Sequence, residues 1–197
     1  MASPASLFNT QELSSATWSD FAKLFSKHGG VQAGCWCMFY HRAGPVTSTA
    51  AGRLDLASRN RNDKRALVRR GNSHGIVVYA GTQPVGSCQY GLKEQLPRID
   101  AGRYYRKLEL ANDPGQLWRI TCFFVDRDFR HRGIATIALR AALEAIRKKG
   151  GGVVEAYPVT NPRAVPIWFG SVGMFEREGF RKIAQLGRST LVMRRTL

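Results

Sequence analysis

The fold is decided by residues 123–135, which read Phe123-Phe124-Val125-Asp126-Arg127-Asp128-Phe129-Arg130-His131-Arg132-Gly133-Ile134-Ala135. Apolar residues at the start of this stretch continue a run that predicts a strand from Trp118 to Val125. Apolar residues recur at helical spacing after the basic turn and predict a long helix from Gly133 to Lys149. The start of a helix offers unpaired backbone N–H groups and the positive end of the helix dipole. The turn therefore predicts an anion site.

Three residues of the turn support a pyrophosphate as the anion. Arg130 and Arg132 bring planar guanidinium groups that can each donate two parallel hydrogen bonds to phosphate oxygens. Gly133 lets a ligand approach the backbone closely. His131 lies inside the same turn and is a further candidate for the anion, with a plain surface histidine as the open alternative.

The pattern Arg130-x-x-Gly133-x-Ala135 after a strand resembles the coenzyme A pyrophosphate signature of the GNAT acyltransferase superfamily, Q/R-x-x-G-x-G/A. The order of elements that follows is also similar: a strand over Val153–Val159, a helix over Ser171–Glu178 and the pair Gly179-Phe180. The Cys-Trp-Cys-Met and Glu-Ala-Tyr-Pro-Val stretches look like those of an uncharacterised bacterial branch of that family. The resemblance implies an α/β domain with a mixed, mostly antiparallel sheet of about seven strands flanked by helices.

The resemblance also implies an activity, the direct transfer of an acetyl group from acetyl-CoA to a primary amine of an unidentified acceptor in a ternary complex. Asn161 stands where the family often has an amide that contacts the cofactor, although Pro162 makes a plain turn an equal alternative. The residues implied to contact acetyl-CoA are Phe124 and Val125 on the pantetheine arm, and Arg130, His131, Arg132, Gly133, Ile134 and Ala135 around the pyrophosphate, with Asn161 nearby.

The catalytic acid departs from the family pattern. Members usually have a Tyr four residues before the Gly-Phe pair, whereas this chain has Phe175, which has no proton to give. Glu155 and Tyr157 share one face of the Val153–Val159 strand, and we assign Glu155 as the base and Tyr157 as the acid. The alternatives are that Glu155 pairs with an arginine and that Tyr157 is a half-buried aromatic residue. Tyr40 and Ser171 are more distant candidates.

The length of 197 residues indicates a single domain over residues 17–197, after a flexible tail over residues 1–16. No apolar run approaches the roughly 20 residues that a membrane helix needs. With four scattered cysteines, the composition predicts a cytoplasmic protein without structural disulfides.

Cys35 and Cys37 allow two interpretations. If residues 34–41 form a strand, the two thiols share one face of it. Alternatively, the pair begins a zinc site with His41, but a second close pair of ligands is missing. We favour the buried strand and predict no metal.

The chain is strongly basic, with 30 Lys and Arg residues against 14 Asp and Glu residues and a net charge of +16. Such a field attracts coenzyme A, acidic molecules and nucleic acid alike, and repels polyamines and aminoglycosides. Nucleic acid is therefore an alternative partner, although we do not favour it. The alternatives to an enzyme are a catalytically inactive GNAT-fold protein that binds nucleic acid and one that senses acyl-CoA. The family often forms homodimers, but nothing in the sequence tests this.

The other expected elements follow from periodicity and turn residues. They are a helix over Thr17–Lys27, a basic helix over Asn62–Arg70, a hairpin of strands Ile76–Ala80 and Pro84–Tyr90, a long connection over residues 92–116 with a helical turn near residues 103–108, and closing strands Phe180–Gln185 and Thr190–Arg194.

Overall fold

The computed structural model describes residues 7–44, 53–108, 110, 115–161 and 168–197. They form a seven-stranded sheet in the order β1-β2-β3-β4-β5-β7-β6. Of the pairings between these strands, only that of β4 with β5 is parallel. The strands are β1 Phe8–Glu12, β2 His74–Ala80, β3 Gln83–Leu92, β4 Leu117–Val125, β5 Val153–Ala156, β6 Arg181–Leu186 and β7 Thr190–Thr196. The fold class predicted from the sequence is confirmed.

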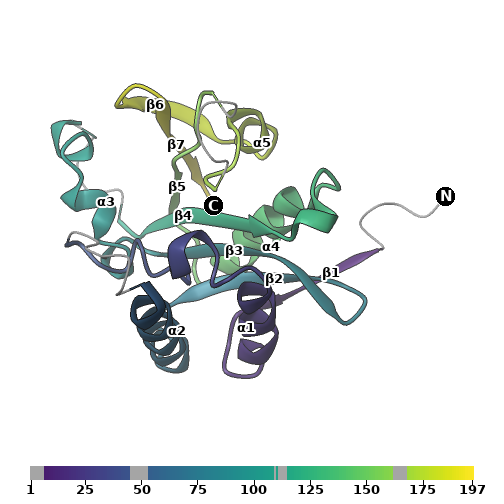
Figure 1. The fold of residues 1–197 in the computed structure, drawn as a ribbon. Coiled ribbons are helices and arrows are strands. Elements are labelled where there is room, and N and C mark those ends of the chain that lie inside the picture. The colour runs from purple at the N-terminus through teal and green to yellow at the C-terminus, as the bar shows by residue number, and fades with distance from the viewer. Residues whose placement is uncertain (1–6, 45–52, 109, 111–114, 162–167) are drawn as a thin grey trace.

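Helices cover both faces of the sheet (Figure 1). The helices α1 (Trp18–Lys27) and α2 (Arg53–Arg69) lie on one side, whereas α4 (Ile134–Lys148) and α5 (Val172–Arg177) lie on the other. The short helix α3 (Arg98–Ala101) belongs to the long connection between β3 and β4. No helix in the described parts of the chain is long and apolar enough to cross a membrane.

Two hydrophobic clusters hold these layers together, one on each face of the sheet. The first joins α4 and α5 to the sheet and includes Ile120, Leu139 and Phe175. The second joins α1 to the opposite face and includes Phe25 and Phe124. Successive strand residues face opposite sides of a sheet, so neighbouring residues of β4 serve both clusters.

The sequence analysis was wrong about two N-terminal segments. Phe8–Glu12, placed in a flexible tail, form the edge strand β1, which pairs with β2 in antiparallel register. Residues 34–41, expected as a strand, form turns after a short 3-10 helix over Gln32–Gly34. Trp36 and Cys37 there have φ angles of 46° and 53°, which a strand does not allow.

Several expectations differ from the structure only in their bounds. The basic helix expected over residues 62–70 is the last part of the longer helix α2, and the strand expected over Val153–Val159 is paired with β4 only through Ala156. The hairpin of β2 and β3 and the predicted helix after Gly133 are confirmed.

Candidate active site

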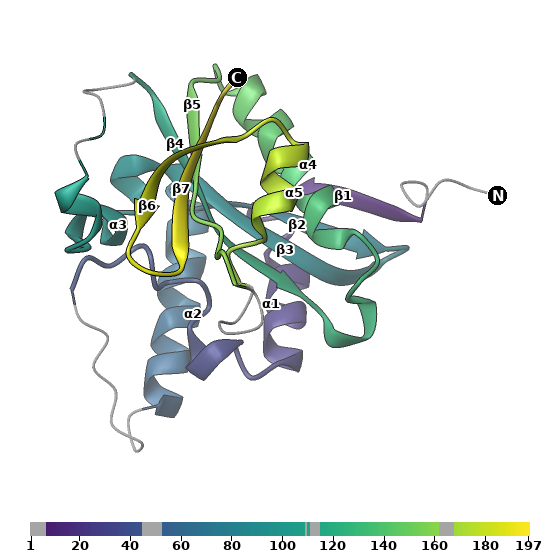
Figure 2. The ribbon, with the colours of Figure 1, turned by 90° about the horizontal axis from the view of Figure 1, so that it is seen from above.

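The site is built around the gap where β4 and β5 separate. The two strands pair from Leu117 with Val153 to Ile120 with Ala156, and β4 then continues alone on this side to Val125. Figure 2 shows β5 between β4 and β7, with the chain that follows it turning away from β4. Part of the gap is filled by the segment before α5, because the Trp168 carbonyl oxygen accepts the Phe123 N–H at 2.6 Å.

Along β4, the backbone N–H and carbonyl groups of successive residues point alternately toward β3 and toward the gap. Asp126 donates its N–H to the Val85 carbonyl oxygen of β3, whereas Phe123 donates away from β3 to Trp168. The backbone groups of Phe123 and Val125 therefore face the gap, and those of Phe124 face β3. The ring of Phe124 packs between Phe25 and Trp168. The sequence analysis named Val125, whose backbone faces the gap, and Phe124, whose backbone faces β3. It did not name Phe123, which period-two counting along the strand places on the same side as Val125.

The basic turn leads into α4 through two left-handed residues. His131 has a φ of 61°, and Gly133, which caps the helix, has a φ of 77°. The first backbone bond of the helix runs from the Ile137 N–H to the Gly133 carbonyl oxygen. The N–H groups of Ile134, Ala135 and residue 136 therefore have no partner within the helix.

The side chains of the turn are open to solvent. Arg130, His131, Arg132 and Gly133 are exposed, Ala135 is half-buried, and Ile134 is buried under the helix. The Arg132 guanidinium lies 5.2 Å from the Phe129 ring centre. Within the described residues, no carboxylate forms an ion pair with Arg130 or Arg132. The Arg130 Nε donates to the Val125 carbonyl oxygen at 3.4 Å. The remaining N–H groups of Arg130 and the guanidinium of Arg132 are available to an anion at the start of α4.

Asp126 fixes the beginning of the same turn. Its side chain is 0% exposed, and its carboxylate accepts hydrogen bonds from Lys27 at 2.7 Å and from the Asp128 N–H at 3.2 Å. Burial is the largest single effect and opposes ionisation of this carboxyl, but the hydrogen bonds from Lys27 and the Asp128 N–H, with the charges of Lys27 and His28, together lower the pKa of Asp126. The turn is thereby tied to the end of α1, a link that the sequence analysis did not find.

Glu155 and Tyr157 lie together at the end of β5. The Glu155 side chain is 0% exposed, and its oxygens accept hydrogen bonds from Tyr105 at 2.8 Å, from Tyr157, and from Arg194 at 2.8 Å. The buried Arg119 lies 4.0 Å away and also forms a two-pronged pair with Asp100. Every oxygen of Glu155 is therefore already occupied.

Two further residues weighed from the sequence, Phe175 and Asn161, have different surroundings. Phe175, at the position of the usual acid, is 0% exposed and packs edge-on against Phe123 and Phe180. Asn161 is exposed and follows the bridge that Val159 makes with Ser171 and Thr190. Residue 162, on which the alternative of a plain turn depends, lies outside the described residues.

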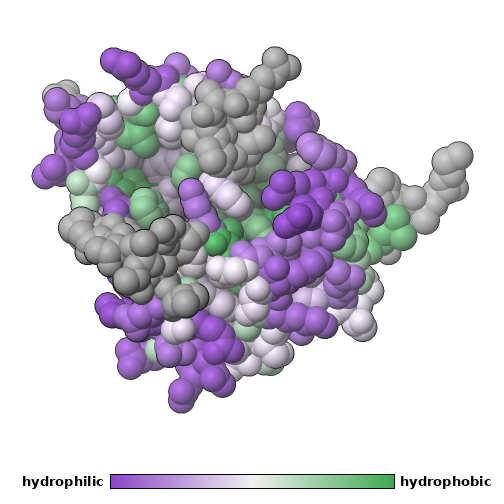
Figure 3. All heavy atoms as spheres, in the orientation of Figure 1, coloured by the Kyte–Doolittle hydropathy of each residue, from purple (hydrophilic) through white to green (hydrophobic). Residues whose placement is uncertain are grey.

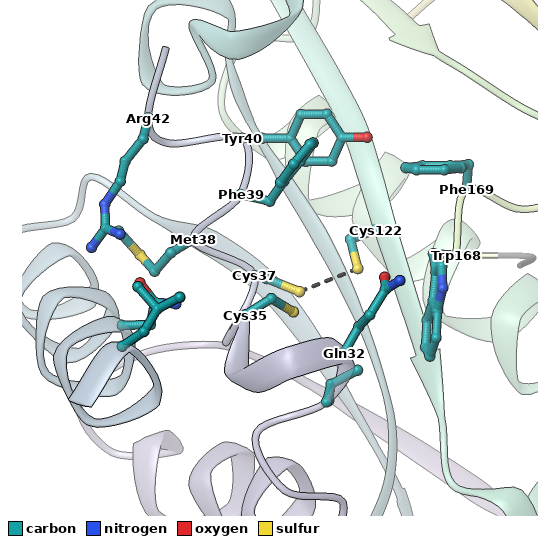
Figure 4. A pocket seen from close by; sticks show the side chains of 13 residues that line it. Gln32, Cys35, Cys37, Met38, Phe39, Tyr40, Arg42, Cys122, Trp168 and Phe169 are labelled. Carbon is teal, nitrogen blue, oxygen red and sulfur yellow. Dashed lines mark hydrogen bonds between the residues drawn. The ribbon is translucent and has the colours of Figure 1, made fainter. Parts of the chain in front are cut away.

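A pocket of about 320 Å³ opens on the α1 and α2 side of the gap. Its lining is mainly aromatic, aliphatic and thiol, and comprises Val31, Gln32, Cys35, Cys37, Met38, Phe39, Tyr40, Arg42, Leu56, Asn60, Cys122, Trp168 and Phe169. Figure 4 shows Trp168 and Phe169 on one side, Met38 and Arg42 on the opposite side, and the thiols of Cys35, Cys37 and Cys122 between them. In the space-filling view, apolar residues lie in a hollow near the middle of the face, with hydrophilic residues beside it (Figure 3).

Two of the three pocket thiols, Cys35 and Cys37, have raised pKa values. The Cys37 Sγ lies 3.2 Å from the Cys122 Sγ, and this contact, together with burial, raises the pKa of Cys37. The pKa of Cys35 is also raised, by a hydrogen bond with Cys37 and by burial. The described residues include no group of three or more His, Cys, Asp or Glu side chains placed to hold a metal ion.

A buried basic group stands behind the thiols. Lys64 is 1% exposed, and burial lowers its pKa to about 8. Its ammonium lies 3.4 Å from Nε2 of His41, whose Nδ1 lies 2.8 Å from the Gln95 carbonyl oxygen. Because that oxygen only accepts, Nδ1 carries the proton and Nε2 accepts. Burial and the Lys64 charge lower the pKa of His41 to about 3, so its ring is neutral.

Comparison with known proteins places this geometry in a family. No curated protein matches the chain. Among solved structures, a putative GNAT acetyltransferase from Desulfovibrio desulfuricans is 13% identical with a TM-score of 0.53, over 96% of this chain and 98% of that one. An N-acetyltransferase from Thermoplasma acidophilum, in complex with coenzyme A, is 12% identical with a TM-score of 0.54, over 96% of this chain and 99% of that one.

A third structure, NAA60 from Arabidopsis thaliana in complex with acetyl-CoA, is 13% identical with a TM-score of 0.51, over 96% of this chain and 99% of that one. At these identities the three structures show a shared fold. The model of the acetyltransferase (GNAT) family matches residues 36–180, which include β4, the basic turn, α4 and β5. The chain therefore belongs to the GNAT acetyltransferase family.

Proposed function

We propose that this protein transfers an acetyl group from acetyl-CoA to a primary amine. The observation that carries the proposal is the separation of β4 from β5 after Ile120, directly beside the positive end of α4. One end of this arrangement offers backbone groups to an extended amide-bearing arm, and the other offers N–H groups and two arginines to a pyrophosphate. Coenzyme A has both parts.

The cofactor residues follow from the positions of their groups. The N–H groups of Ile134 and Ala135, at the glycine-capped start of α4, would bind the pyrophosphate with Arg130 and Arg132. The pantetheine arm would lie along the backbone of Val125. His131 and Asn161 flank these positions and remain predicted contacts. For Phe124 we propose a packing role, because its backbone faces β3.

In the reaction, the amine nitrogen attacks the thioester carbonyl carbon and the carbon–sulfur bond breaks. The nitrogen loses one proton to water, and the thiolate accepts one proton and leaves as the thiol of coenzyme A. The negative charge that builds on the carbonyl oxygen needs a fixed N–H donor. The Phe123 N–H is in the gap and is bonded to the Trp168 carbonyl oxygen. We assign it to the thioester oxygen, which would replace that carbonyl as its partner.

Tyr157 suits the role of acid better than Glu155 suits that of base. Tyr157 follows the last paired residue of β5, and burial and the Glu155 carboxylate raise the pKa of its hydroxyl, which is therefore protonated and donates to Glu155. In this proposal the hydroxyl turns its proton to the departing thiolate. Glu155 already accepts hydrogen bonds from Tyr105, Tyr157 and Arg194. In this proposal Glu155 positions Tyr157, and the amine reaches the site in its neutral form.

Calorimetric titration with acetyl-CoA tests the cofactor site. We compare the wild-type protein with Arg132→Glu and with Arg65→Glu, which makes the same change of net charge at an exposed position of α2. Arg132→Glu should weaken binding at least tenfold, and Arg65→Glu should change it less than twofold. Equal losses in both variants would indicate a general charge effect, as a nucleic-acid-binding protein would show, and no binding by the wild type would overturn the proposal.

A further inference from the structure

The pocket on the α1 and α2 side reaches the place where an acetyl group would be transferred. Cys122 of its wall stands on β4 two residues beyond Ile120, the last residue paired with β5. Trp168 also lies in the wall, and its carbonyl oxygen accepts a hydrogen bond from the Phe123 N–H. An amine in this pocket would therefore approach the gap from the face opposite α4.

The walls exclude one large class of amines. None of the thirteen described lining residues is Asp or Glu. The one charged side chain among them is Arg42, and its guanidinium already pairs with Asp63. A polycation needs carboxylates to replace its hydration, because an unpaired charge in an apolar site is costly.

The charges around the pocket favour a neutral nucleophile. Lys64 is buried behind the thiols, and Arg61 lies 5.8 Å from the ring centre of Trp36. Positive neighbours and an apolar wall both disfavour an ammonium and so lower the pKa of a bound amine. The attack on a thioester needs that unprotonated form.

The size and the rings of the pocket define the body of the ligand. The volume of about 320 Å³ is at the lower end of the range of small-molecule sites. Phe39, Tyr40, Trp168 and Phe169 supply aromatic surfaces, and the Tyr40 and Phe169 rings stand edge-to-face at 6.2 Å. Flat apolar groups pack well against such surfaces.

We infer that the acceptor is a small monoamine whose amino group is carried on a flat, apolar body, and that this pocket rejects polyamines. The inference rests on the proposed function, since it names the acceptor of that reaction. Gln32 provides a way to test it, because its side chain is exposed at the pocket wall and lies near Trp168 (Figure 4). Gln32→Glu adds one carboxylate to the wall with almost no change in shape.

The experiment uses 2-phenylethylamine and spermidine as probes, each with the full-length protein. Binding is measured by calorimetry in the presence of coenzyme A, and acetylation is measured by mass spectrometry with acetyl-CoA. The wild type should bind and acetylate 2-phenylethylamine at least tenfold better than spermidine. Gln32→Glu should reduce this ratio at least fivefold, whereas Gln11→Glu, at an exposed position on β1, should leave it unchanged.

The failures of the two proposals can be told apart. If acetyl-CoA binds but spermidine is the better acceptor, the inference about the acceptor is overturned and the proposed function stands. A different result would separate the proposals in the other direction. If acetyl-CoA does not bind, the proposed function is overturned. The pocket chemistry is still supported in that case if 2-phenylethylamine binds and Gln32→Glu weakens its binding relative to that of spermidine. Preferred acetylation of a peptide N-terminus over 2-phenylethylamine would also overturn the inference.

Discussion

The ammonium nitrogen of Lys27 lies 2.7 Å from Oδ2 of Asp126, and this ion pair joins the last residue of α1 to the turn before α4. The Asp126 carboxylate also accepts the Asp128 N–H and so shapes the turn itself. The backbone of Asp126 bonds to Val85 of β3. One buried carboxylate therefore holds a helix, a strand and the proposed pyrophosphate turn in a fixed relation.

Asp126→Asn should weaken acetyl-CoA binding roughly tenfold, because the turn loses its charged anchor and the start of α4 is held less precisely. Asp128→Asn is the control, since Asp128 is exposed and lies 3.3 Å from the same Lys27. It should change affinity less than twofold. Calorimetric titration of both variants checks the prediction, and equal affinities for Asp126→Asn and the wild type would contradict it.

Glu155→Gln should lower the free energy of unfolding by about 3 kcal/mol, because it leaves buried arginine charge without its partner. Arg119 is 0% exposed, and the Arg194 Nε lies 2.8 Å from the Glu155 Oε2. Urea denaturation measures the change. Glu144→Gln, which removes an exposed partner of Arg147, should cost less than about 0.5 kcal/mol.

The same variant separates the two roles considered for Glu155. If Glu155 only positions Tyr157, Glu155→Gln should lower the free energy of unfolding, and the pH profile of any remaining turnover should keep its shape. If Glu155→Gln unfolds at the wild-type urea concentration and loses turnover together with the acidic limb of its pH profile, Glu155 is the base predicted from the sequence.

The central part of the fold could be predicted because its signals are local. Leu117–Val125 are mostly apolar, with Arg119 and Thr121 as the polar exceptions, as suits a strand buried on both faces. The helix after Gly133 has helical periodicity and a left-handed glycine directly before its first residue. These features depend on neighbours within a few residues. The predicted bounds of α4 differ from the observed ones by one residue at each end.

The parts that could not be predicted depend on distant partners. β1 is a short polar edge strand whose order comes from pairing with β2, more than sixty residues later. The residues 34–41 alternate like a strand, yet Trp36, Cys37 and Met38 are all buried, which a strand with one exposed face would not allow. The partners of Glu155 lie at residues 105, 119 and 194, and no local spacing reveals them.

Lys64 should make stability depend on pH in a defined window. Its pKa is lowered from 10.5 to about 8, so between these values the unfolded chain binds the extra proton and the folded protein does not. Stability therefore rises with pH across this window by an amount on the order of 3 kcal/mol, and Lys64 contributes no pH dependence below it.

The contribution of Lys64 can be isolated from that of other groups by comparison with Lys64→Met. Buried tyrosines also titrate at high pH and oppose the rise, because their raised pKa values favour unfolding there. The difference in free energy of unfolding between the two proteins cancels those groups. It should increase in favour of the wild type from pH 8 to pH 10.5, and a flat difference would show that Lys64 is not the group responsible.

Gly86 of β3 sets how closely α4 approaches the sheet. A Cβ atom at this position would lie 2.5 Å from Cγ2 of Ile134, the first residue of α4, which is closer than real contacts allow. Ile134 is β-branched and cannot easily rotate away. Gly86→Ala should therefore lower the free energy of unfolding by about 1–3 kcal/mol and also weaken acetyl-CoA binding, because it displaces the start of α4.

A double-mutant cycle checks this contact directly. Ile134→Ala removes Cγ2 and should itself cost about 2–5 kcal/mol, but combined with Gly86→Ala the total cost should be smaller than the sum by about 1–2 kcal/mol. Gly173→Ala in α5 is the control, because its new Cβ would meet only the end of the Arg177 side chain at 3.4 Å. That variant should be neutral or slightly stabilising. Strictly additive costs for Gly86→Ala and Ile134→Ala would show that this glycine does not set the position of α4.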